Sequence, residues 1–142
     1  MRYLIAALAL FVAPFAALAE EVRVHDFEGS YEDATFALEN AIIGQGLVVD
    51  HVSDVGDMLA RTREDVGSDV VLYDGAVVMQ FCSATLSRKM MEADPLNIAH
   101  CPYGIFVIDR GGEVQIGYRT FPEGEMQEVQ TFLEEIVQEA LE

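Results

Sequence analysis

The sequence has 142 residues, of which 25 are acidic and 8 basic, and its formal net charge at pH 7 is −17. A surface this acidic repels nucleic acid and anionic lipid, so neither is expected as a partner. Hydrophobic residues make up 51% of the chain, which is enough to build a core and excludes a disordered protein.

The first nineteen residues have the layout of a secretory signal peptide. Arg2 supplies a positive charge, an apolar stretch follows, and Ala19 lies at a small-residue cleavage position. The apolar stretch is interrupted by Pro14 and is shorter than the roughly 20 residues that span a bilayer. We therefore predict cleavage after Ala19, a periplasmic location, no membrane insertion of the mature chain, and a single domain over residues 20–142.

The first half of the mature chain alternates strand and helix patterns. Residues 21–27 alternate apolar with polar side chains and predict a strand. Ser30 has the position of a helix cap, and the helix that it begins ends before the glycines at 44 and 46. Residues 47–52 predict a second strand, and a second helix follows from Ser53 or Asp54 to Gly67.

The second half begins with the most apolar strand pattern of the chain, residues 75–81, which predicts a central strand covered on both faces. A helix from about Ser83 to Ala93 follows, and Asp94 and Pro95 end it. Residues 103–109 then predict another apolar strand.

The last strand pattern comes directly after a tight turn at Gly111 and Gly112. Residues 114–118 alternate in polarity, so the two final strands are predicted to form a hairpin. An amphipathic helix is predicted over residues 123–142. The order βαβαβαββα predicts an α+β fold, with a single mixed sheet of about five strands and helices packed on it.

Several segments, in the same order along nearly the whole mature chain, resemble domain-of-unknown-function family 302. The segments that carry the resemblance are Phe36 and Leu38, residues 46–49, residues 78–83, Asp94-Pro95, residues 102–105 and residues 112–118. Each is a fold pattern and not a catalytic signature. The resemblance implies a compact α+β domain that is often a homodimer and has no established activity.

The two cysteines of the chain, Cys82 and Cys101, follow one predicted strand and precede the next. In an exported domain they are expected to form a disulfide, because the periplasm oxidises thiols that can meet. A helix that folds back between antiparallel strands brings the two to one edge, whereas a parallel crossover places them at opposite edges. The bridge would add roughly 3 kcal/mol by restricting the unfolded chain.

Two functional alternatives use the same cysteines. His100 precedes Cys101, and a neighbouring imidazolium lowers the pKa of a thiol, which would suit redox chemistry. Met90 and Met91 add soft ligands, so Cu(I) binding is the second alternative. Packing in the core is the simpler role for these methionines.

A small anionic ligand is a further hypothesis. His100, Tyr103, Tyr118 and Arg119 lie at or near the ends of the terminal hairpin and could bind such a ligand if they converge. Ordinary packing of half-buried tyrosines is the alternative. His25 and His51 could face each other from neighbouring strands, although their spacing fits no zinc template, and surface histidines are the simpler interpretation.

No stretch of the sequence carries a dinucleotide, phosphate-loop, nucleophile-elbow or calcium-loop motif. We therefore predict no catalytic residue, cofactor or metal. The sequence favours a non-enzymatic exported domain with a structural disulfide that binds a small molecule or a protein, with the thiol-redox and Cu(I) roles as alternatives.

Overall fold

A computed structural model describes residues 21–142, and the predicted signal peptide lies outside these residues. Four α-helices, one 3-10 helix and five strands follow one another in this order: β1 (Val22–Asp26), α1 (Tyr31–Gly44), β2 (Val49–Asp54), α2 (Val55–Thr62), β3 (Gly75–Phe81), α3 (Ala84–Ala93), η1 (Pro95–His100), β4 (Tyr103–Arg110), β5 (Glu113–Arg119) and α4 (Gln127–Ala140). The predicted order of strands and α-helices is confirmed.

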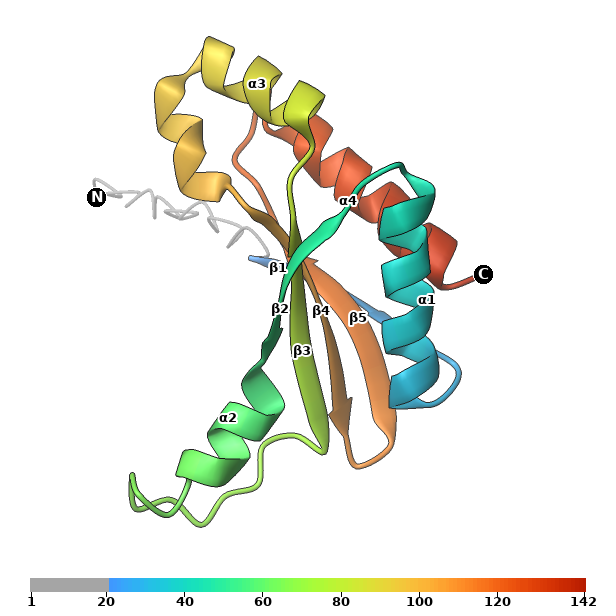
Figure 1. Ribbon diagram of the computed structural model, residues 1–142, viewed down its shortest axis with the longest axis vertical. Helices are drawn as coiled ribbons and strands as arrows, with labels where there is room; N and C mark the ends of the chain where they lie inside the picture. The colour runs from blue at the N-terminus through green and yellow to red at the C-terminus, as the bar shows by residue number, and fades with distance from the viewer. Residues whose placement is uncertain (1–20) are drawn as a thin grey trace, which may run out of the picture.

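The five strands form one sheet in the order β1-β5-β4-β3-β2, and every neighbouring pair is antiparallel. The α+β class and the number of strands are confirmed, but the expected mixture of strand directions is wrong. The reason is visible in Figure 1, where α2 and α3 lie near opposite ends of the sheet. A helix in that place returns the chain antiparallel to the strand it left, so α2 and α3 each connect neighbouring antiparallel strands.

One face of the sheet is covered by α1 and α4, which lie side by side (Figure 1). Alternate residues of the strands point toward these helices, among them Phe81, Ile105 and Ile116, and all three are buried. From α4, Leu133 and Ile136 close the same core. Burying such a side chain contributes about 1.5–3 kcal/mol, so this layer holds the domain together.

The opposite face of the sheet carries no helix over its middle among the described residues (Figure 1). Val22 and Val24 are exposed there, while Val78 and Phe106 are half-buried. The prediction that residues 75–81 are covered on both faces is therefore wrong, although β3 is an interior strand. A run of apolar residues does not distinguish a strand that is covered on both faces from a strand that has one open face.

Local signals in the sequence explain where the helices begin and where the hairpin turns. The Ser30 hydroxyl accepts from the backbone N–H of Asp33, whose carboxylate accepts in return from the N–H of Ser30, as in a capping box. Gly111 and Gly112 both have positive φ, which the tight turn between β4 and β5 requires. In residues 21–142, no helix is long and apolar enough to cross a membrane.

Candidate functional site

A hollow of about 350 Å³ lies on the open face of the sheet, next to η1. Its apolar lining comes from neighbouring strands: Val22 of β1, Phe106 of β4 and Val78 of β3. Polar side chains from the loop and strand ends, His100 and Arg119 among them, complete the lining. The hollow therefore joins an apolar lining to charged and polar groups, as small-molecule sites commonly do.

Two glycines shape the sheet beneath the hollow. Gly104 lines it, and a Cβ atom added there would come within 3.4 Å of Val78, an ordinary contact. At Gly117, a Cβ would lie 2.5 Å from both the Phe106 ring and the carbonyl oxygen of Arg23. The bare backbone at Gly117 thus lets the Phe106 ring lie against β5, where it lines the hollow.

The polar groups of the hollow are incompletely paired. His100 Nδ1 is buried and has no hydrogen-bond partner among residues 21–142, while the imidazole packs against Phe121 with ring centres 5.6 Å apart. The Arg119 side chain makes no hydrogen bond or ion pair with any residue in 21–142, and Arg119 is exposed. A buried polar atom without a partner is uncommon in a folded protein and costs stability.

Three of the four predicted ligand residues line this hollow: His100, Tyr103 and Arg119. The Tyr103 ring is buried and packs edge-on against Phe81 and Phe121, so ordinary packing accounts for most of its surface. Tyr118 does not join them. It pairs with Arg23 of β1, and both line a cleft on the helix-covered side of the sheet.

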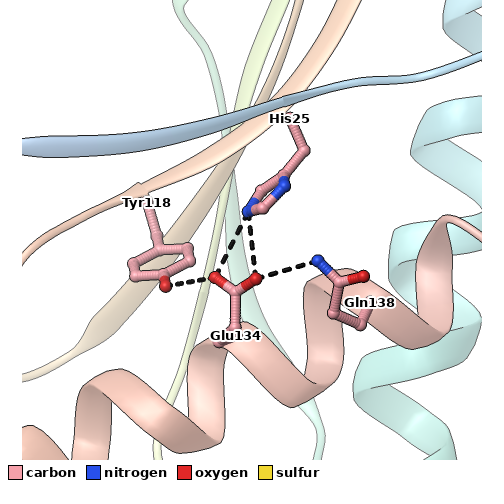
Figure 2. A network of polar contacts seen from close by, with 4 residues as sticks. All are labelled: His25, Tyr118, Glu134 and Gln138. Carbon is pink, nitrogen blue, oxygen red and sulfur yellow. Dashed lines mark hydrogen bonds and ion pairs between the residues drawn. The ribbon is translucent and has the colours of Figure 1, made fainter.

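That second cleft, of about 630 Å³, lies between α4 and the strands β1 and β5 and contains a polar network (Figure 2). Glu134 of α4 accepts hydrogen bonds from the Tyr118 hydroxyl and from Gln138 Nε2, at 2.5 and 2.8 Å. His25 Nε2 lies 3.1 and 3.2 Å from the two oxygens of the same carboxylate. The network ties the edge strand β1 and its neighbour β5 to α4.

The environment shifts two pKa values in this network. Burial, and then the hydrogen bond to Glu134 and the charge of its carboxylate, raise the pKa of Tyr118 well above its ordinary value of 10.0. Burial alone would raise the pKa of Glu134. The hydrogen bonds from Tyr118, Gln138 and His25 outweigh that effect and hold this pKa below its ordinary value of 4.5. Glu134 is therefore a carboxylate at neutral pH, and Tyr118 keeps its proton.

Both cysteines are free thiols in the structure, so the predicted disulfide is not formed. The fold-back of α3 does bring Cys82 and Cys101 to the same end of the sheet, beside the paired residues Phe81 and Tyr103. The two sulfurs are not joined covalently. The prediction was right about the edge of the sheet and wrong about the bond, because neighbouring strand ends fix proximity and not the geometry that a disulfide needs.

The wider set of soft ligands does not assemble. Met90 is buried in the core, which agrees with the packing interpretation. His25 and His51 lie on β1 and β2, the two opposite edges of the sheet, so they do not face each other. Within residues 21–142, no group of three or more histidine, cysteine, aspartate or glutamate side chains is placed to hold a metal ion.

The comparisons with known proteins agree with this architecture. The model of the family described as domain of unknown function DUF302 matches residues 21–142. The chain belongs to the DUF302 family. The crystal structure of an uncharacterised conserved DUF302 protein from Bacillus stearothermophilus is similar in fold, with a TM-score of 0.59 and 17% sequence identity over 86% of this chain and 88% of the other. No curated protein matches the chain.

The polar network of this DUF302 domain is the feature that sequence reasoning missed. Glu134 is one of 25 acidic residues, and its spacing to Gln138 is ordinary for an exposed helix face. His25 is separated from Glu134 by 109 positions. Only the packing of α4 across the strands makes this carboxylate different from its neighbours.

Proposed function

We propose that this DUF302 domain is an exported, periplasmic and non-enzymatic protein that binds a small amphipathic anion in the hollow on its open sheet face. The ligand would place an apolar body over Val22, Val78 and Phe106, and a carboxylate or similar acidic group toward Arg119. No reaction is assigned to the site.

The observation that carries the proposal is that Arg119, which has no side-chain partner in residues 21–142, lies beside an open apolar sheet face. A guanidinium offers several N–H donors in a planar fork that matches a carboxylate. His100 supports the same assignment, because its buried Nδ1 lacks a hydrogen-bond partner at the edge of this hollow. A bound ligand would satisfy polar groups that have no partner in residues 21–142.

Size and charge limit which ligands fit. The hollow measures about 350 Å³, at the lower end of the range typical for small-molecule sites. Glu21 also lines it, so a ligand with several negative charges is disfavoured. The net charge of −17 repels anions at a distance, and affinity must therefore come from close contacts. A compact apolar molecule with one acidic group is the best match.

The test uses anilinonaphthalenesulfonate, a fluorescent probe with an apolar body and one anionic group, and the mature protein. We expect saturable binding that Arg119→Gln weakens about tenfold, the worth of roughly one charge-assisted hydrogen bond. Arg88→Gln is the matched control, because Arg88 pairs with Glu92 on α3 and does not line the hollow. Gly104→Val should weaken the probe further by filling the hollow.

Two results would overturn the proposal. Equal affinity of the probe for the Arg119→Gln variant and the parent protein would show that the arginine does not bind the anion. Loss of probe binding on concentrating the protein, with a dimer appearing in sedimentation, would show that a second copy of the chain occupies the face instead.

The periplasmic location is tested separately. The mass of the protein recovered from the periplasm of a Gram-negative host should correspond to a chain that starts at Glu20. A cytoplasmic protein that keeps residues 1–19 would contradict export without bearing on the ligand site.

A further inference from the structure

The second feature of interest is the pair of thiols at the end of the sheet near α3. In the β3–β4 ladder, Phe81 pairs with Tyr103. Cys82 directly follows Phe81, and Cys101 comes two residues before Tyr103, so both cysteines leave the ladder at the same end. Cys82 is exposed and Cys101 is partly buried, which leaves the pair accessible to a small ion.

A serine hydroxyl contacts the inner thiol. The Ser87 hydroxyl of α3 lies 3.4 Å from Cys101 Sγ and 3.3 Å from the Tyr103 hydroxyl. Cys82 follows the neighbouring end of β3, beside the residues that lead into β4. Both sulfurs thus lie at one end of the sheet, and the contact with Ser87 helps to fix the position of the Cys101 sulfur.

We propose that Cys82 and Cys101 form a two-thiolate binding site for monovalent copper, separate from the ligand hollow. Thiolates are soft ligands and select Cu(I), which is stable with two of them. Zn²⁺ requires four ligands in a structural site, and no third histidine, cysteine, aspartate or glutamate joins the pair in residues 21–142. On binding, the two thiol protons pass to solvent and one Cu⁺ takes their place.

The proposal narrows the ligand set that the sequence suggested. Met90 is 2% exposed and belongs to the core, so its sulfur is used in packing. His100 packs on Phe121 and lines the hollow on the open face. An ion held by two sulfurs needs neither Met90 nor His100 as a ligand, so substitution of His100 serves as a control in the experiment.

The test is a competition for Cu(I) between the reduced mature protein and bicinchoninate under anaerobic conditions. We expect one Cu(I) per chain. Cys82→Ser and Cys101→Ser should each lower the affinity by more than about 100-fold, whereas Ser87→Ala, which removes only an orienting group, should lower it by about 10-fold. His100→Gln should leave it unchanged. Circular dichroism verifies that each variant is folded.

Three outcomes would overturn the copper site. One is Cu(I) affinity that survives the loss of either cysteine. Another is Zn²⁺ binding as tight as that of Cu(I), which would require ligands other than this pair. The third is a Cys82–Cys101 bridge that reductant cannot open in the folded protein. Probe binding at Arg119 is measured independently, so a failure of one site is distinguishable from a failure of the other.

Discussion

The contact between Tyr118 and Glu134 offers the sharpest test of the energetics. Tyr118→Phe keeps the buried ring and removes only the hydroxyl that donates to the carboxylate. A hydrogen bond to a charged group is worth about 1.5–3 kcal/mol. The Glu134 side chain is 35% exposed, so water can replace part of the lost interaction, and we expect a loss near the lower end, about 1.5 kcal/mol. With a urea m-value of about 1.5 kcal/mol/M, the unfolding midpoint would fall by about 1 M.

Tyr103→Phe is the matched control. Tyr103 is buried as fully as Tyr118, but its hydroxyl accepts a hydrogen bond from the neutral Ser87, at 3.3 Å, in place of a contact with a carboxylate. Its loss should therefore cost about 0.5–1 kcal/mol. A double-mutant cycle of Tyr118→Phe with Glu134→Gln should show a coupling of about 1 kcal/mol, above the ~0.5 kcal/mol within which independent sites add. Coupling smaller than that, or equal losses for the two tyrosines, would refute the reasoning.

Three further predictions concern pH, backbone packing and the core. Because the pKa of Glu134 is lowered on folding, its contribution to stability is complete above its ordinary pKa of 4.5 and is lost as pH falls through the folded value. Urea unfolding of Glu134→Gln should thus depend less steeply on pH below about 4.5 than that of the parent. Gly117→Ala, whose new Cβ would meet the Arg23 carbonyl oxygen, should cost about 1–3 kcal/mol in the same assay, and an unchanged midpoint would contradict that steric clash. Leu133→Ala should cost about 2–5 kcal/mol while Leu96→Ala, at a side chain that is 77% exposed, costs less than about 0.5 kcal/mol, and similar losses would contradict the assigned core.

The elements that sequence analysis located depend on neighbours along the chain. Ser30 and Asp33 begin α1 because they lie three residues apart, and Gly111 with Gly112 turns the hairpin because both backbones adopt positive φ. The apolar run of residues 75–81 located β3 as an interior strand, although it did not show that one face is open. Such signals are local, so a single sequence contains them.

Strand order and side-chain convergence depend on residues far apart in sequence. The residues around His51 do not show that β2 and β1 form opposite edges of the sheet. The position of a strand depends on which other strands it pairs with, and those lie far away in the sequence. Convergence of His100, Tyr118 and Arg119 was predicted only conditionally. Tyr118 lies on the other face of the sheet from Arg119, and the strand period alone does not say which face the helices cover. Glu134 gave no signal among the other carboxylates.

The pairing of β1 with β5 has a consequence for how the chain reaches its final state. Val22 pairs with Arg119, so β1 meets the one strand that it pairs with in residues 21–142 after nearly all of the described chain has been made. During synthesis β1 remains unpaired, with its backbone hydrogen-bonding groups in water, until β5 has been synthesised and α4 can pack on the sheet. Closing so long a segment is slow compared with forming the adjacent β4–β5 hairpin. A ribosome-bound chain that ends before residue 113 should consequently leave its N-terminal strand open to proteases, which makes completion of the sheet a late and nearly all-or-none event.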